Sequence, residues 1–275
     1  MEELKDKYFN QNAAGVSAVE FFWGLGFPVV MESTFLQVFL KKAGASDFLI
    51  GLVPAILIAG FSLLPLVSSY FTRNLETRRN IVLYLHVISS VSTLVYGILL
   101  LYIQDTQWVI PAFFISYIIF SLCIGLTFPV WLDFLIKIFS ENKNIKGLSI
   151  MYLAQNAAKI IASIFILKVV EAFDLSMTSA AWIFVASGML FLIGSLCFLF
   201  TKELPAKISS EDYEQSFYSH TKKTILDILA NKNLVKFLIG DLDNYIIMTI
   251  ISFYAVYATQ FYQITDYTAA GLFVA

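Results

Sequence analysis

Two glutamates and a lysine lie in stretches of sequence that are otherwise apolar enough to cross a membrane. Glu20 and Glu32 belong to VEFFWGLGFPVVMESTFLQVFL, and Lys159 belongs to GLSIMYLAQNAAKIIASIFIL. A charge at the centre of a bilayer costs about 2.5–3.5 kcal/mol on insertion scales, so such residues are candidates for binding solutes or protons. Glu32, Glu20 and Lys159 are therefore the first candidates for a substrate or ion pathway.

Lys159 shares one face of its predicted helix with other polar residues. They recur at steps of three and four and are Ser149, Tyr152, Asn156 and Ser163. A polar stripe on a membrane helix is expected to face a cavity or another helix; we favour a cavity, and hydrogen bonding between helices is the alternative. Asp241 and Asn244, in the seventh predicted helix, form a smaller polar set and complete the candidate pathway.

The depth of these residues predicts a specific pair. If the first helix begins near residue 17 and the fifth near residue 147, a rise of about 1.5 Å per residue puts Glu32 about 23 Å and Lys159 about 18 Å from the same membrane face. We predict that Glu32 and Lys159 form an ion pair, either directly or through a bridging solute or water. The alternative is a static pair that only makes two buried charges tolerable. Glu20 is expected near the cytoplasmic entrance.

The composition indicates an all-α polytopic membrane protein. Of the 275 residues, 59% are hydrophobic and 14% are charged, whereas soluble domains are about 25% charged. The apolar residues form long blocks typical of membrane spans. The predicted helices cover about 17–40, 48–72, 81–103, 109–137, 147–170, 179–200 and 233–260, with a truncated eighth near 268.

A polar segment divides the chain after the sixth helix. We expect a six-helix transmembrane half over residues 1–200, a cytoplasmic central loop over 201–232, and the incomplete start of a second half over 233–275. Within the loop, Thr221 to Leu229 predicts a short amphipathic helix at the membrane surface. Lys and Arg concentrate in the N-terminus and in the loops after even-numbered helices, which predicts a cytoplasmic N-terminus in the plasma or inner membrane.

The loop YFTRNLETRRN, between the second and third helices, resembles the cytoplasmic signature of the major facilitator superfamily, roughly G-x-L-a-D-r-x-G-R-R. Arg78 and Arg79 match its terminal pair, whereas Tyr70 and Asn74 stand at the first glycine and the aspartate. The resemblance covers essentially the whole chain and implies two parallel six-helix halves. It also implies a cytoplasmic gate that closes through charge pairs with an acidic residue in helix four. The gate candidates are Arg73, Arg78, Arg79 and Asp133; simple anchoring of helix ends by the arginines is the alternative.

The resemblance implies a secondary active transporter that moves a small solute by alternating access. The chain has no G-x-x-x-x-G-K-[ST] loop for ATP, and no H-E-x-x-H or G-x-S-x-G motif that would indicate a membrane enzyme. We expect no cofactor and no nucleic-acid partner; the expected partners are lipid, a small-molecule substrate and H⁺ or Na⁺. Seven helices and part of an eighth predict a fragment of a longer protein. A transporter-like sensor or assembly protein without transport activity is the alternative.

Overall fold

The computed structural model of the chain describes residues 2–31, 35–103, 106–173, 175–205, 216–243, 246–247, 257 and 261–262. All regular secondary structure within these residues is helical. Six helical segments are long and apolar enough to span a membrane, which confirms the predicted all-α membrane fold. They are Phe9–Lys42, Asp47–Thr72, Arg79–Tyr102, Gln107–Ile138, Glu141–Val169 and Met177–Phe200.

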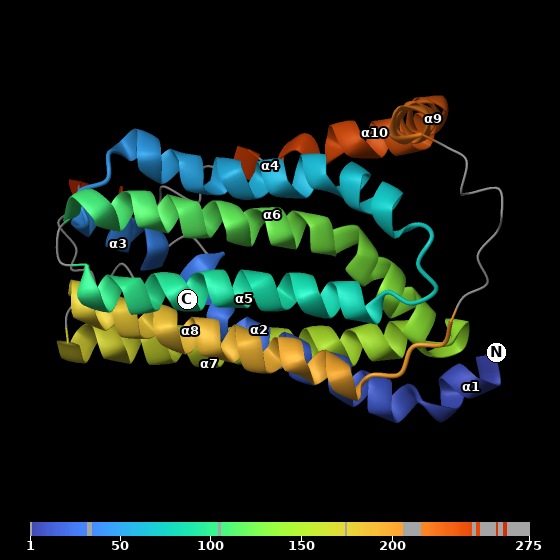
Figure 1. Cartoon of the computed structure of the whole chain (residues 1–275), viewed down its shortest axis with the longest axis horizontal. Coiled ribbons are helices and arrows are strands. Elements are labelled where there is room, and N and C mark those ends of the chain that lie inside the picture. The colour runs from blue at the N-terminus through green and yellow to red at the C-terminus, as the bar shows by residue number, and fades with distance from the viewer. Residues whose placement is uncertain are drawn as a thin grey trace.

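The six spans lie side by side with their axes along one direction (Figure 1). The first contains α2 (Phe9–Val30) and α3 (Phe35–Lys42). The next five contain α4 (Asp47–Thr72), α5 (Arg79–Tyr102), α6 (Thr106–Ile138), α7 (Asn144–Phe173) and α8 (Met177–Leu196). Short helices flank the spans: α1 (Glu2–Lys7), η1 (Glu141–Lys143), η2 (Cys197–Phe200), α9 (Phe217–Ala230) and α10 (Lys232–Gly240).

The first span begins earlier than the sequence predicts. The predicted helix begins near residue 17, whereas α2 begins at Phe9. The reason is the buried side chain of Asn12, which donates hydrogen bonds to the carbonyl oxygens of Ile138 (3.0 Å) and Lys202 (2.9 Å) and accepts one from the Lys202 amide (2.7 Å). The polar sequence here suggests a loop, but the Asn12 side chain instead joins the start of α2 to the end of α6 and to the residues after η2.

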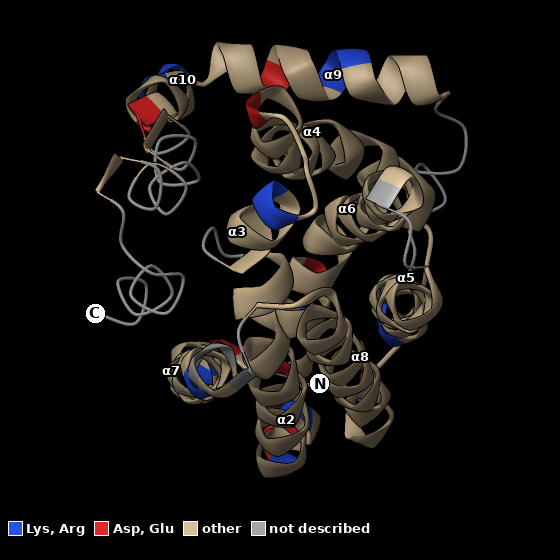
Figure 2. Ribbon diagram, turned by 90° about the vertical axis from the view of Figure 1, so that its left-hand side faces the viewer, with Lys and Arg blue, Asp and Glu red and all other residues tan. Residues whose placement is uncertain are grey.

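Pairwise packing sets the order of the helices in the bundle. α2 packs along α7 and α8, α5 packs along α8 and α6, and α4 packs along α6. Figure 2 shows the same order nearly end-on. Aromatic rings fill the centre: the Trp23 ring centroid lies 4.5 Å from that of Phe191 and 4.6 Å from that of His86. The polar residues of the candidate site are therefore held on a packed apolar scaffold.

Glycines allow the closest helix contacts. A Cβ atom at Gly188 of α8 would lie 2.5 Å from the backbone nitrogen of Leu94, and one at Gly97 of α5 would lie 2.6 Å from that of Val185. At Gly125 of α6, a Cβ would collide with the carbonyl oxygen of Gly60 in α4. Small residues drive helix association in membranes because they let backbones approach closely.

The α5–α8 contact predicts the effect of a single methyl group. Gly188→Ala is expected to lower the free energy of unfolding by about 1–3 kcal/mol, because two packed backbones must separate to admit the Cβ. Thermal unfolding of the purified protein in detergent measures the change. Gly240→Ala is the control, since in the described part of the chain no atom outside the neighbouring residues and backbone of α10 lies within 4 Å of a Cβ there. Equal melting temperatures for Gly188→Ala and the parent protein would contradict this packing.

Candidate functional site

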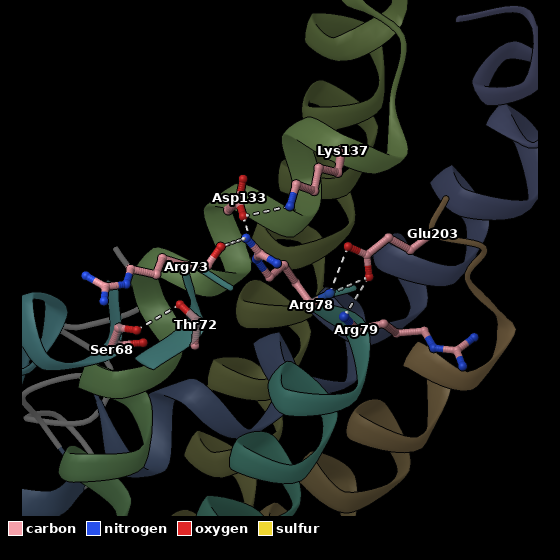
Figure 3. A network of polar contacts seen from close by, with 8 residues as sticks. All are labelled: Ser68, Thr72, Arg73, Arg78, Arg79, Asp133, Lys137 and Glu203. Carbon is pink, nitrogen blue, oxygen red and sulfur yellow. Dashed lines mark hydrogen bonds and ion pairs between the residues drawn. The ribbon is translucent and has the colours of Figure 1, made fainter. Parts of the chain in front are cut away.

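One end of the bundle carries most of the charged contacts, and we call it the charged end. It comprises α1, residues 73–78 between α4 and α5, η1, and residues 201–205 after η2. Here Arg78 Nε donates a hydrogen bond of 2.7 Å to Asp133 Oδ2, and Lys137 Nζ lies 3.2 Å from the same oxygen (Figure 3). Arg78 is 7% exposed, whereas the Asp133 side chain is 42% exposed. The structure thus brings together two of the predicted gate residues.

Arg73 and Arg79 have other surroundings. The guanidinium carbon of Arg73 lies 4.2 Å from the ring centroid of Tyr70, and Figure 3 shows its side chain turned away from Asp133. Arg79 Nη1 donates to the carbonyl oxygen of Thr201 at 3.0 Å. Of the four gate candidates, Arg78 and Asp133 form a direct contact that links the loop between α4 and α5 to α6.

Glu203 is a residue of the charged end that the sequence reasoning missed. Its carboxylate accepts hydrogen bonds from the backbone amides of Arg78 (2.7 and 2.8 Å) and Arg79 (2.7 Å), where α5 begins. The first amides of a helix lack partners within the helix, and a carboxylate there is favoured by hydrogen bonding and by the helix dipole. Arg78 provides no side-chain cap of its own. The segment after η2 therefore caps α5 from outside.

Burial raises the pKa of the Glu203 carboxyl, against the opposing effects of the two backbone amides and of Lys137 and Arg78. Glu203 therefore becomes protonated at a higher pH than an exposed glutamate does. The sequence carries a weak signal for this role, because Glu203 follows the sixth span directly in TKELP. Which helix it caps depends on the packing of α5 against α8.

A second polar cluster lies between α2 and α7, within the spans. Glu20 is 5% exposed and accepts a short hydrogen bond from Gln155 Nε2. The helices approach closely one turn further along, where a Cβ at Gly24 would lie 2.5 Å from the Gln155 carbonyl oxygen. Glu20 is eleven residues beyond Phe9, about 17 Å along α2. The placement of Glu20 near the cytoplasmic entrance stays a prediction, because the start of α2 does not mark the membrane face.

Lys159 lies next to this cluster on α7. Its ammonium is 5.2 Å from the ring centroid of Phe27 on α2, and its charge acts favourably on the Glu20 carboxylate. Gln155 and Lys159 are four residues apart and so share a helix face. Glu32, the predicted partner of Lys159, lies outside the described residues. The Glu32–Lys159 pair thus stays a prediction. Gln155 is a neighbour of Glu20 that the sequence does not predict.

The rest of the predicted stripe changes in exposure along α7. Tyr152 and Asn156 are exposed, with Asn156 Nδ2 donating to the Tyr152 carbonyl oxygen at 2.9 Å, whereas Ser163 is buried. Asp241 is half-buried and follows α10 directly, and Asn244 lies outside the described residues. Across the residues that the structure describes, no group of three His, Cys, Asp or Glu is placed to hold a metal ion. The arrangement suits proton or solute binding by single charged groups.

The Glu203 cap predicts a local change in stability. Glu203→Ala is expected to speed hydrogen exchange at the amides of Arg78 and Arg79 by roughly 2–30-fold, since loss of a cap costs about 0.5–2 kcal/mol. Hydrogen exchange read by mass spectrometry on peptides spanning residues 75–85 measures the change. Glu76→Ala, at an exposed glutamate of the neighbouring loop, is the matched control. Exchange unchanged by Glu203→Ala would show that the carboxylate does not support α5.

Comparison with known proteins places this architecture in a family. The model of the Major Facilitator Superfamily matches residues 15–275, which include all six spans except the first residues of α2. None of the curated proteins compared with the chain matches it. Members of this superfamily are membrane transporters and not enzymes, and membership implies secondary transport of small molecules. The chain is a multi-pass membrane protein that belongs to the Major Facilitator Superfamily.

Proposed function

We propose that this chain is the first six-helix half, with the start of the second, of a secondary active transporter that moves a small solute across the cytoplasmic membrane by alternating access. The observation that carries the proposal is the polar cluster between α2 and α7. Burying a carboxylate at membrane depth costs free energy, so such a residue is a candidate for function. Glu20 has an amide donor, Gln155, and a lysine, Lys159, as its neighbours.

The charged end is proposed to face the cytoplasm. It contains lysines and arginines from the N-terminus, from residues 73–78 and from η1, with Arg79 next to it at the start of α5. The positive-inside rule assigns such an end to the cytoplasmic side. The opposite end carries Lys41, whose ammonium lies 2.7 Å from Asp47, so part of its positive charge is neutralised locally. This orientation puts Glu20 and Lys159 between the two faces.

The pathway is proposed to pass the face of α2 and α7 that carries Glu20 and Lys159. A carboxylate in such a place can bind a proton and become neutral, which removes the cost of the charge during movement through the membrane. Glu32 remains the first candidate for the coupling proton, with Glu20 second. Tyr152 and Asn156 are exposed on α7, the helix that carries Lys159, and are proposed to face the solute.

The Arg78–Asp133 pair is proposed to act as part of a cytoplasmic gate. It joins the start of α5 to α6, with Glu203 holding the same turn of α5 from the other side. Because Asp133 is half-exposed, the pair contributes at most about 1 kcal/mol, which is small enough to break in each transport cycle. A contact of this strength biases the balance between two states without fixing either.

Alternating access predicts that a residue on the pathway is reachable from both membrane faces. Asn156→Cys, in a chain with Cys123→Ala and Cys197→Ala, is expected to react with a membrane-impermeant maleimide from either side of the membrane. Asp133→Asn is expected to raise the rate from the cytoplasmic side by roughly 2–5-fold, because loss of the ion pair favours the inward-open state. Labelling of the full-length protein in right-side-out and inverted vesicles measures both rates.

Three variants control this experiment. Ile145→Cys, at an exposed residue of the charged end, should react only from the cytoplasmic side, and Trp108→Cys, at the opposite end, only from outside. Glu141→Gln replaces an exposed carboxylate of η1, also at the charged end, and should leave the rates at position 156 unchanged. Reaction of Asn156→Cys from a single side, whatever residue stands at position 133, would favour a static sensor or assembly protein.

If Glu32 or Glu20 carries the coupling proton, its substitution should affect uphill accumulation and exchange differently. Glu32→Gln is expected to abolish uphill accumulation of a solute identified by counterflow while exchange continues, because glutamine cannot carry a proton and exchange requires no net proton movement. Counterflow and gradient-driven uptake in proteoliposomes measure the two activities. Glu20→Gln tests the second candidate in the same way, and Glu76→Gln is an exposed control. Unchanged accumulation in both pathway variants would remove these residues from the coupling mechanism.

A further inference from the structure

α9 lies across the direction of the membrane spans. Figure 1 views α9 along its axis while the spans lie lengthwise, and Figure 2 shows the reverse. In both views α9 is on the outer side of α4. The Tyr70 ring, in the last turn of α4, lies 5.3 Å from the Phe217 ring and 5.7 Å from that of His220 between centroids. α9 therefore runs parallel to the membrane plane at the level where a span ends.

Three faces run along α9, at about 100° per residue. Thr221, Thr224 and Ile228 are half-buried and lie on the side of the Phe217 contact with Tyr70. The polar face carries Ser219, Lys223 and Asp227, all exposed. The remaining face is apolar and exposed, and its residues are Tyr218 (75% exposed), Ile225 (43%), Leu226 (55%) and Leu229 (61%).

The charges on α9 decide which partner suits the apolar face. Lys222 projects between Leu229 and Leu226, so a protein partner covering this face would have to bury its ammonium. A bilayer surface imposes no such cost, because lysine buries its aliphatic stem and extends its charge to the lipid phosphates. Lys223 lies on the polar face. Together, Lys222 and Lys223 outnumber Asp227, the single acidic residue of α9. Positive charge beside a leucine-rich face is the composition of helices that lie on anionic membranes.

We propose that α9 docks on the anionic phospholipid surface of the leaflet at the charged end. The face formed by Tyr218, Ile225, Leu226 and Leu229 enters the headgroup region, and Lys222 and Lys223 contact lipid phosphates. The Tyr70 contact then fixes the height of α4 relative to the leaflet. This inference goes beyond the proposed transport function and does not depend on which side of a cell membrane the charged end faces.

Spin labels on α9 test the proposal in symmetric vesicles. The full chain with Cys123→Ala and Cys197→Ala receives single cysteines at Ile225 and Leu229, on the apolar face, or at Ser219 and Asp227, on the polar face. Vesicles contain phosphatidylcholine alone or mixed with phosphatidylglycerol. With phosphatidylglycerol, labels at 225 and 229 are expected to collide more with oxygen than with a water-soluble nickel complex. Labels at 219 and 227 are expected to show the opposite preference.

The lysines provide the charge test. Lys222→Gln with Lys223→Gln is expected to shift the label at Leu229 toward nickel access in phosphatidylglycerol vesicles, and raised salt should do the same in the parent chain. A label at Leu229 that is shielded from both reagents would show that protein, from this chain or a second copy, covers the face. Nickel access at 229 in every vesicle would show that the face is in water. Either result overturns the proposal, as would identical behaviour in the two lipid mixtures.

Discussion

The hydrocarbon core of a bilayer offers no hydrogen-bond partners, so polar groups buried in or beside the spans are stabilised by partners within the protein. Glu203 satisfies the first amides of α5, Asn12 joins the ends of α2, α6 and η2, and Gln155 donates to Glu20. All three partnerships join segments that are far apart in the sequence. The same groups that make the spans tolerable in lipid therefore also fix the helices relative to one another.

The two polar clusters are connected through α2. Its first turn is tied by Asn12 to the ends of α6 and η2, and its middle carries Glu20 and Gly24 against α7. Movement of α2 relative to α7 would thus disturb both the charged end and the Glu20 site. This connection gives a physical basis for a half that moves as one body around a central pathway, as the proposed mechanism requires.

The sequence predicts the spans well because the bilayer imposes a simple length and composition. Five predicted spans agree with the structure to within about four residues at each end. The first span does not, because its first two turns contain polar residues such as Asn12 that serve other helix ends. Hydropathy registers the polarity of such a residue and carries no information about its partner.

The candidate site is predictable only in part, for a related reason. A costly charge such as Glu20 or Lys159 stands out in an apolar stretch, and Arg78 and Asp133 follow from a resemblance in short motifs. Gln155 and Glu203 do not stand out, because a glutamine in a helix and a glutamate after a span are ordinary. Their roles arise from the packing of α2 on α7 and of α5 on α8. Contacts of this kind require the three-dimensional arrangement.

The contact between Arg78 and Asp133 is proposed to bias the balance between inward-open and outward-open states. A double-mutant cycle with Arg78→Gln and Asp133→Asn tests it, with the ratio of cytoplasmic to external labelling at position 156 as the readout. If the contact acts as proposed, each single variant shifts the ratio in the same direction and the double variant shifts it no further. Independent, additive shifts would show that the two residues act separately and would contradict the gate.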